Sequence, residues 1–364
     1  MNDLLLLSVL ALAFVNGAND NMKGVATLIG SRSLSYQSGV LLATLSTVLG
    51  CLASGILATS LLHAFSGKGL VPSDFVTTSF LAAVAIAATI TLAAATVIGM
   101  PVSTTHAIVG SLVGAGWLTA GSSLNLTALG WVFLFPLLLG PVAALVMAWG
   151  LSSWGRRLSV RYQIKMSDCL CLNRQQLTPA PESGATTAER HSRVSVVHRD
   201  SCAPGYEGYV WGIEVEKCIK SAHCVAGGLV GFAHGLNDTP KLLGLVVGVS
   251  ALSPTAGVFG VTTAMALGGL FGARKVAETL SKKLTDMTPG QGVAGGFSTA
   301  LLMLVASPLG LPMSTTHVST GSIVGIGMFR QSVRWPKTFA VLGAWIVTLP
   351  LAAGLGALLV KLLP

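Results

Sequence analysis

Long apolar segments separated by short polar breaks run along nearly the whole chain. Segments long enough to cross a bilayer lie at 3–30, 38–62, 76–99, 102–119 and 127–153, and again at 222–251, 254–271, 287–306, 312–329 and 336–362. Because these segments have the length and continuity of membrane helices, the pattern predicts an all-α integral membrane protein.

Polarity divides the chain into three parts. We expect an N-terminal transmembrane repeat at 1–153, a polar linker at 154–221 and a C-terminal transmembrane repeat at 222–364. Each repeat has about five hydrophobic segments, and an odd number places the second repeat in the opposite orientation from the first. Inverted-topology repeats of this kind are a common build for secondary transporters.

Composition and charge support this picture and set an orientation. Hydrophobic residues make up 52% of the chain and charged residues 10%, as expected of a membrane protein. If the N-terminus is outside, 18 of the 22 Lys and Arg lie on the inner side. We therefore expect both termini outside and the linker in the cytoplasm. The net charge of +9 then reflects the excess of Lys and Arg on the cytoplasmic side, and we expect no nucleic-acid partner. The apolar run Leu4–Val15 lacks a basic leading segment, so we expect a retained span and not a signal peptide.

Two acidic residues lie in the interior of the apolar segments. They are Asp20 and Asp238, in near-copies of one motif 218 residues apart: Gly17-Ala-Asn-Asp-Asn-Met-Lys23 and Gly235-Leu-Asn-Asp-Thr-Pro-Lys241. A charge in hydrocarbon is costly unless it is paired or lines a wet cavity. The duplication therefore predicts one functional site built from both halves.

A second motif also occurs twice, 211 residues apart. It reads Gly99-Met-Pro-Val-Ser-Thr-Thr-His106 and Gly310-Leu-Pro-Met-Ser-Thr-Thr-His317. Proline followed by hydroxyl residues is a helix-start signal. Inside a bilayer such a start predicts a broken or re-entrant helix at the centre, surrounded by protein or water. Helix N-termini with hydroxyls suit an anion. The candidates are Ser103, Thr104, Thr105, Ser314, Thr315 and Thr316.

Small residues follow both copies of this second motif, at Val109–Gly116 and Thr320–Gly327. They predict close contact between helices. The histidines that end the motif, His106 and His317, have two interpretations: each handles protons, or each is a buried neutral side chain bonded to backbone.

The linker is rich in cysteine and histidine. Its residues Cys169, Cys171, Cys202 and Cys218 are joined by Cys224 just beyond it, with His191, His198 and His223 nearby. Thiolates suit zinc or a metal cluster, but this spacing fits no standard zinc knuckle. Two interpretations of the linker therefore remain: a metal site, or a loop whose thiols are reduced.

With these motifs the chain resembles the inorganic phosphate transporter (PiT) family, which carries Gly-Ala-Asn-Asp in each half and a Pro-x-Ser-Thr-Thr-His-like segment further on. The likeness covers both halves and omits only the linker. The resemblance implies a symporter in a plasma membrane or bacterial inner membrane that imports phosphate with a sodium or proton gradient and has no cofactor. It also implies that Asn19, Asp20, Asn237 and Asp238 hold the coupling cations, sodium included, while the two Asn and the six hydroxyl residues bind phosphate. A homodimer is one arrangement that the sequence leaves open.

The chain departs from the family at one repeated position. The family usually reads Asn-Asp-x-x-Asn, whereas Lys23 and Lys241 stand at the last position here. An Asp and a Lys three apart share a helical face and can pair. We hypothesise that both lysines replace bound sodium, which favours proton coupling or exchange. The alternative is that both snorkel to an aqueous edge.

Three other functions stay open from the sequence. Sulfate or another oxyanion would also suit the hydroxyls, although phosphate can additionally donate a hydrogen bond to Asp20 or Asp238. A passive anion channel ringed by the two lysines is disfavoured by the buried acids. An enzyme using Ser103 and His106 as nucleophile and base would lack a third orienting group, so no enzymatic activity is expected.

Overall fold

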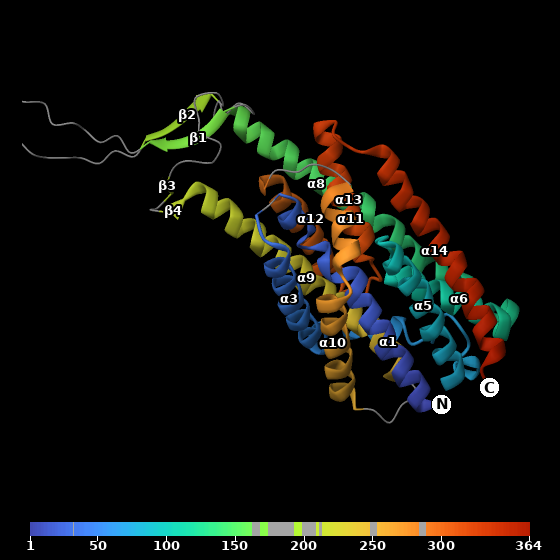
Figure 1. Cartoon of the computed structure of the whole chain (residues 1–364). Coiled ribbons are helices and arrows are strands. Elements are labelled where there is room, and N and C mark those ends of the chain that lie inside the picture. Colours follow the sequence, from blue (N-terminus) through green and yellow to red (C-terminus); the bar gives the residue numbers. More distant parts are fainter. Residues whose placement is uncertain are drawn as a thin grey trace, which may run out of the picture.

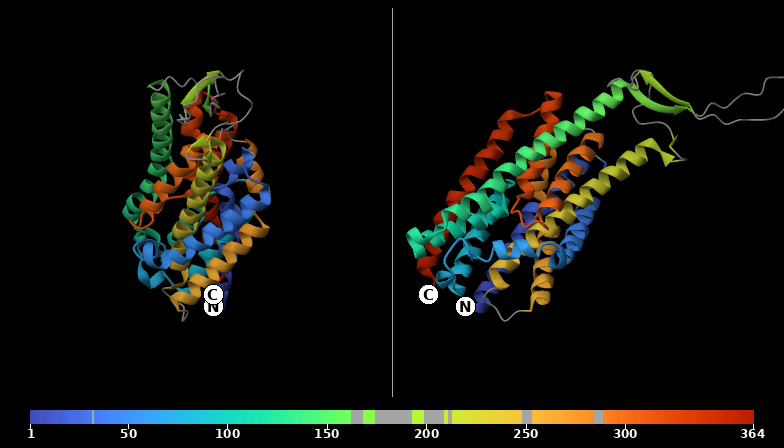
Figure 2. Two further views of the ribbon diagram at one scale, coloured as in Figure 1. Left: turned by 90° about the vertical axis from the view of Figure 1, so that its left-hand side faces the viewer. Right: turned by 180° about the vertical axis from the view of Figure 1, so that it is seen from behind.

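The structure is a computed structural model that describes residues 1–31, 33–161, 168–173, 193–198, 209–210, 213–247, 253–283 and 289–364. Its helices run side by side, and both chain termini lie at one end of the bundle (Figures 1 and 2). The strands of the linker lie at the opposite end. The predicted all-helical membrane architecture is therefore confirmed for the apolar part of the chain.

The first half runs through twelve helical elements. They are α1 (Asn2–Asp20), η1 (Asn21–Lys23), α2 (Ala26–Gly30), α3 (Tyr36–Leu57), α4 (Thr59–Ala64), η2 (Ser73–Phe75), α5 (Thr78–Ile98), α6 (Thr104–Ala120), η3 (Gly121–Ser123), α7 (Leu126–Ala128), η4 (Leu129–Leu134) and α8 (Phe135–Arg161). The described part of the second half has six helices. They are α9 (Val215–Val247), α10 (Pro254–Phe271), α11 (Arg274–Lys283), α12 (Pro289–Ala306), α13 (Thr315–Arg330) and α14 (Trp335–Leu362).

The linker departs from an all-helical reading. Strand β1 (Asp168–Asn173) pairs antiparallel with β2 (Arg193–His198), and β3 (Tyr209–Val210) pairs antiparallel with β4 (Ile213–Glu214). Two linker cysteines, Cys169 and Cys171, belong to β1, whereas Cys202 and His191 lie outside the described residues. The linker metal site therefore stays a prediction.

Fewer helices are full membrane spans than the ten apolar segments suggest. By length and composition, six described helices can cross a bilayer, and the pair α10–α11, bent by 67°, adds a seventh if the two helices form one span. The helices α6 and α13 have only 17 and 16 residues, short of the ~20 that a full span needs. They begin inside the protein, as the hydroxyl motifs predict. The chain is a multi-pass membrane protein.

Two glycines in the left-handed region allow the breaks before these short helices. Gly99 caps α5 with a φ of 79°, and Gly310 has a φ of 69° in the turn between α12 and α13. A side chain at either position would be strained, because only glycine adopts this conformation readily. Each break redirects the chain so that the following helix starts deep in the bundle.

Helices from the two halves interleave, and every major contact has a counterpart. The helix α6 packs along α14 of the other half, and α13 packs along α8. In the same way α3 packs along α9, and α1 along α10, as the mixed colours of Figure 1 show. The helices of each half are therefore buried partly by helices of the other half.

The small-residue runs make this close packing feasible. A Cβ added to Gly114 would lie 1.9 Å from the carbonyl oxygen of Ala353 in α14. A Cβ added to Gly321 would lie 2.3 Å from the carbonyl oxygen of Pro141 in α8. The prediction of close helix contact at both runs is confirmed, because the backbones approach to a distance that only glycine permits.

Candidate phosphate and cation site

Both hydroxyl motifs start helices as predicted. The Ser103 hydroxyl accepts a hydrogen bond from the His106 backbone N–H (3.1 Å), and the Ser314 hydroxyl accepts one from the His317 N–H (3.4 Å). These are N-cap bonds, which satisfy N–H groups that the first turn of a helix leaves free. The two helix starts lie in the same buried region as both Asn-Asp motifs.

Each buried acid pairs with the lysine three residues after it. The Lys23 ammonium lies 2.5 Å from Asp20 Oδ1, and the Lys241 ammonium lies 2.8 Å from Asp238 Oδ1. Lys23 is 6% exposed and Lys241 is 0% exposed. The alternative that these lysines snorkel to an aqueous edge is therefore wrong in this structure.

Each lysine also reaches the hydroxyl motif of the opposite half. Lys241 Nζ donates to Thr105 Oγ1 and to the carbonyl oxygen of Met313, both at 2.8 Å. Lys23 Nζ donates to the Thr316 hydroxyl and, at 3.5 Å, to the carbonyl oxygen of Val102. Each ammonium is thus held by a carboxylate, a threonine hydroxyl and a main-chain carbonyl, in two matching arrangements.

The remaining threonines also face the acids or their neighbours. The Thr315 hydroxyl donates to Asp20 Oδ2 at 3.3 Å. The Thr104 hydroxyl accepts from Asn16 Nδ2 at 2.7 Å. All six hydroxyl candidates are buried, so the cluster is closed to solvent in this conformation.

The two asparagines of the first motif hold the breaks in place. Asn19 donates to the carbonyl oxygen of Met100 (3.1 Å) and accepts from the Val102 N–H (3.2 Å). Asn237 donates to the Met313 carbonyl (3.1 Å) and to Asp238 Oδ1 (2.7 Å). Asn19 therefore positions the segment before α6, and Asn237 positions the segment before α13. Direct phosphate binding by either stays a prediction.

Sequence reasoning missed two residues of this cluster, His234 and Asn16. His234 Nε2 lies 3.5 Å from Asp238 Oδ2 and 3.1 Å from Asn16 Oδ1, while Asn16 Nδ2 donates to Asp238 Oδ2 at 2.9 Å. The signal was available, because these two residues are 218 apart like the acids and each stands four residues before its Asp. Helical periodicity places them on the same face.

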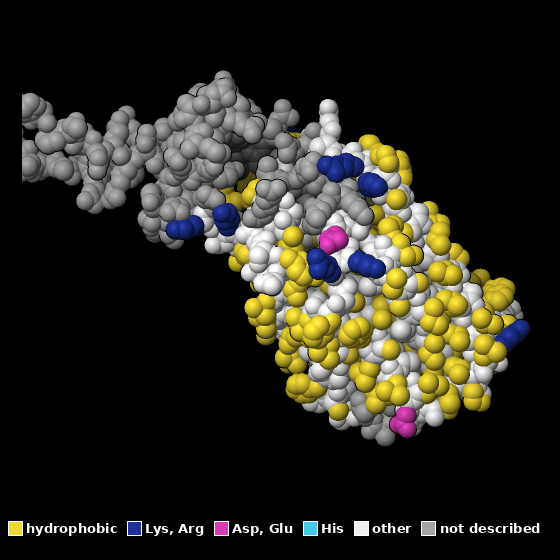
Figure 3. Space-filling model, viewed as in Figure 1, with side chains coloured by type: hydrophobic (Ala, Val, Ile, Leu, Met, Phe, Trp, Pro, Cys, Tyr) yellow, Lys and Arg dark blue, Asp and Glu magenta, His cyan; other side chains and the backbone are white. Residues whose placement is uncertain are grey.

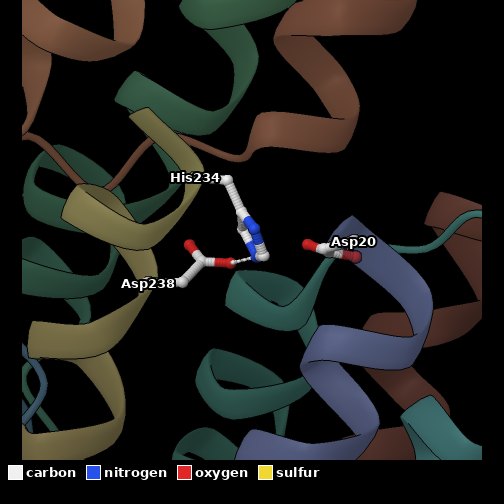
Figure 4. Close-up of side chains that lie close together, drawn as sticks. All are labelled: Asp20, His234 and Asp238. Atoms are coloured by element: carbon white, nitrogen blue, oxygen red, sulfur yellow. Dashed lines mark ion pairs between the residues drawn. The ribbon is translucent and has the colours of Figure 1, made fainter. Parts of the chain in front are cut away.

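Figure 4 shows His234 between the two acids, with its ring turned toward Asp238. Ligand atoms of Asp20, His234 and Asp238 lie within 4.8 Å of one another, close enough to hold a metal ion. The donor set suits sodium poorly, because sodium prefers oxygen ligands and both carboxylates already pair with lysines.

The histidines that end the hydroxyl motifs meet across the two halves. The rings of His106 and His317 lie 4.4 Å apart between centroids, and the His317 ring lies 3.7 Å from the Trp345 ring. The described structure gives His317 no hydrogen-bond partner through its ring nitrogens. Proton handling by this pair stays a prediction.

Comparison with known proteins decides the family. A family model described as "Phosphate transporter family" matches residues 16–356. The chain belongs to this family. Phosphate is the substrate that such a protein carries across the membrane, and the family consists of transporters, not enzymes.

Relatives in distant organisms match over nearly the full chain. The Thermococcus kodakarensis protein named "Putative phosphate permease TK2061" is 30% identical over 97% of this chain and 95% of its own. "Inorganic phosphate transporter 2-1, chloroplastic" of Arabidopsis thaliana is 30% identical over 94% of this chain and 68% of its own.

A solved structure, "The sodium-dependent phosphate transporter", matches with a TM-score of 0.75. It covers 99% of this chain and 98% of the other, at 22% sequence identity. At that identity the match shows the fold alone.

Proposed function

We propose that this transporter imports phosphate by alternating access, and that Lys23 and Lys241 replace bound sodium so that protons couple its transport. The observation that carries this proposal is the coordination of the two ammonium groups. Each lies among a carboxylate, a threonine hydroxyl and a main-chain carbonyl, all oxygen ligands of the kind that bind sodium in transporters.

The charges of the site support this assignment. Asp20 and Asp238 contribute two negative charges and the lysines two positive charges, so the cluster is neutral before phosphate arrives. Two unpaired carboxylates would repel a divalent anion, and a sodium-coupled site needs added cations to remove that repulsion. Here the cations are covalently attached, so this cluster has no electrostatic need for sodium.

Each pair also offers a way to couple protons. Transfer of a proton within a pair leaves the net charge unchanged, so coupling requires that a pair takes up or releases a proton. Protonation of one acid from solution would leave the charge of its lysine uncompensated, and the resulting positive charge would attract an anion more strongly. The imidazole of His234 and the amide of Asn16 also contact Asp238.

The matched contacts support an inverted repeat that moves by alternating access. One phosphate-binding helix start belongs to α6, which packs on α14, and the other to α13, which packs on α8. Relative rocking of these helix pairs would open the cluster to one side at a time. With both termini outside, as the positive-inside pattern favours, the linker end is cytoplasmic.

A narrow crevice beside Lys23 supports release toward the linker end. It has a volume of about 20 Å³, and its lining includes Gly292, Gly295 and Gly296 of α12. Gly292 packs against His223 near the start of α9, where the chain leaves the linker. The positions of α5 that correspond at the 211-residue offset carry larger side chains, Leu81, Val84 and Ala85, and all three are buried. The linker side is thus the less tightly filled one.

The test is uptake of labelled phosphate into proteoliposomes with sodium and pH gradients imposed separately. We expect uptake to follow the pH gradient, to ignore sodium and to be weakly inhibited by sulfate. Sodium-driven uptake would refute the lysine assignment. Uptake of sulfate in place of phosphate under either gradient would refute phosphate as the imported substrate.

A further inference from the structure

A layer of three residues from three helices lies at the linker end of the crevice beside Lys23. The His223 Nε2 atom of α9 lies 2.9 Å from the Thr27 hydroxyl of α2. The His223 ring also covers Gly292 of α12, where an added Cβ would lie 2.2 Å from Nε2. Thr27 and Gly292 line the crevice together with Lys23. The histidine therefore lies against two walls of the crevice.

This layer lies at the boundary between buried and exposed residues at the linker end. His223 is 0% exposed, whereas Lys220 is exposed and Ala222 is half-buried just before it in α9. Gly292 is likewise buried, whereas Gly290, two residues before it in α12, is exposed. Movement of this one layer would therefore connect the crevice to the aqueous side.

The crevice itself is narrow and lined by small and polar residues. Its volume of about 20 Å³ exceeds the ~10–15 Å³ that one water needs. Four small residues of α12 line it, at the spacing of three and four that places residues on one helical face. They are Gly292, Gly295, Gly296 and Thr299. On α13, Ser319 lies about one turn after Thr316, which binds Lys23. A polar route thus leads from the lysine toward His223.

The corresponding layer at the other end of the molecule is apolar. The offsets of the two repeated motifs, 218 residues for α9 and α2 and 211 for α12, give the counterpart of each residue in the layer. In the order histidine, threonine, glycine, these counterparts are Leu5, Leu245 and Leu81. All three leucines are buried in one hydrophobic core. Leucine offers no hydrogen bond to a hydrated anion, whereas imidazole and hydroxyl groups do. The two ends are therefore closed by different chemistry.

We propose that His223 and Thr27 form the gate through which phosphate leaves the site toward the linker end. This assignment rests on the proposed function, in which the crevice beside Lys23 leads to the side of release. The closed gate is held by the bond between the two side chains and by the contact of the ring with Gly292. The open gate exposes an imidazole and a hydroxyl group, both of which can hydrogen-bond a passing phosphate.

The closed gate is held weakly, which suits a part that must open in every cycle. The described structure gives His223 Nδ1 no hydrogen-bond partner, although the atom is buried. A buried polar atom without a partner costs free energy, and water satisfies it once the ring turns outward. Opening therefore exchanges one hydrogen bond within the protein for bonds from water to both ring nitrogens.

The charges around the gate favour an anion that leaves. On the face seen in Figure 3, the described Lys and Arg side chains lie mainly toward the linker end. Lys217 and Lys220 occupy exposed positions of α9, six and three residues before His223. Positive charge outside the gate attracts phosphate from the crevice toward the aqueous side.

The test measures how fast a cysteine inside the crevice reacts with a membrane-impermeant thiol reagent added from the linker side. The six native cysteines are replaced by alanine, and Ser319→Cys is the target, because Ser319 lines the crevice and is 7% exposed. Thr27→Val removes the hydroxyl and keeps the shape of the side chain. We expect the reagent to react roughly 2- to 10-fold faster in this variant, the effect of one lost hydrogen bond. His223→Ala should raise the rate further, since it removes the whole ring.

Two control variants separate a gate from a general loosening of the helices. Thr27→Ser keeps the hydroxyl and should leave the rate as it is in the parent. Val225→Ala shortens a side chain of α9 that is 56% exposed and lies outside the crevice, and it should also leave the rate unchanged.

Three results would overturn the gate. They are unchanged rates in Thr27→Val and His223→Ala, an equal increase in Val225→Ala, and an equal increase for reagent added from the opposite side of the membrane. The reaction needs neither phosphate nor an ion gradient. It can therefore fail while the uptake assay of the proposed function succeeds, or succeed while that assay fails.

Discussion

Two neighbouring ion pairs, each fully buried, dominate the chemistry at the scale of single residues. A buried pair gains little net stability, because desolvation offsets the attraction, but a charge left without its partner is costly. Asp20, Asp238 and both lysines therefore depend on one another. Their repeated spacing, three residues in each motif, places each acid beside its own lysine.

Removal of one acid should damage both fold and transport. Asp238→Asn leaves the Lys241 ammonium buried without a counter-charge, so we expect a loss of about 3–5 kcal/mol in stability, seen as a lower melting temperature in detergent. Phosphate uptake should be lost as well. Asp238→Asn combined with Lys241→Met should recover most of the stability but no uptake. A stable single variant would show that the lysine finds another partner.

Removal of both ammonium groups tests their role as substitutes for sodium. In the double variant Lys23→Asn with Lys241→Asn, two carboxylates lose their cations and the motif regains the amide usual in the family. We expect phosphate uptake to become dependent on sodium, measured in proteoliposomes with and without a sodium gradient. Uptake that stays at the original rate and ignores sodium would show that the lysines do not act as cations for the substrate.

Short helices that begin inside the bundle are the decisive feature at the scale of elements. Their first turns depend on serine caps, on left-handed glycines before them and on glycine faces that contact α14 and α8. Each device lies close in sequence to the hydroxyl residues, so the same segment builds the helix and supplies the groups that we propose bind the anion.

The serine caps should matter for affinity. Ser103→Ala removes the N-cap of α6, which costs about 0.5–2 kcal/mol, and it loosens the turn that carries Thr104 and Thr105. We expect a higher KM for phosphate in uptake assays. The control is Ser35→Ala, which removes a comparable cap from α3, where the Ser35 hydroxyl accepts from the Ser38 N–H at an exposed position. An equal change of KM in both variants would contradict a role at the site.

The glycine faces should matter for stability. Gly114→Ala forces α6 away from α14, because the new Cβ would meet the Ala353 carbonyl at 1.9 Å. We expect a destabilisation of about 1–3 kcal/mol, read from thermal unfolding. Gly343→Ala in α14 is the control, since a Cβ there meets nothing within 4 Å. No difference between the two would mean that the helices separate without cost.

Interleaving of the two halves governs the behaviour of the whole molecule. The main partner of α6 is in the second half and that of α13 in the first, so the apolar faces of each half are covered by the other. The site is likewise shared, because each lysine binds the hydroxyl motif of the opposite half. We therefore expect the site to assemble only when both halves fold together.

Separate expression of the halves tests this view. We expect residues 1–153 and residues 213–364, each produced alone, to be degraded or aggregated, since the glycine-lined faces would be uncovered. When both are produced together they should copurify and restore some phosphate uptake. A half that is stable and monodisperse by itself would show that the repeats fold independently.

Much of the site followed from the sequence by itself. The Asp–Lys pairs are local, because residues three apart share a helical face, and the Pro-Ser-Thr-Thr runs carry their own helix-start signal. The duplication at fixed offsets then implied a single site with two contributions. Hydropathy likewise identified a membrane protein, because the preference of a segment for the bilayer depends on its own residues and not on distant ones.

Contacts between segments far apart in sequence were decided only by the tertiary structure. The bonds from Lys23 to Thr316 and from Lys241 to Thr105, the placement of His234 against Asn16, and the contact of Thr27 with His223 all join the two halves. Such contacts depend on which helix packs beside which, and close packing at glycine faces determines that choice. Helical periodicity cannot specify which helices pack together, because periodicity relates only residues within one segment of the chain.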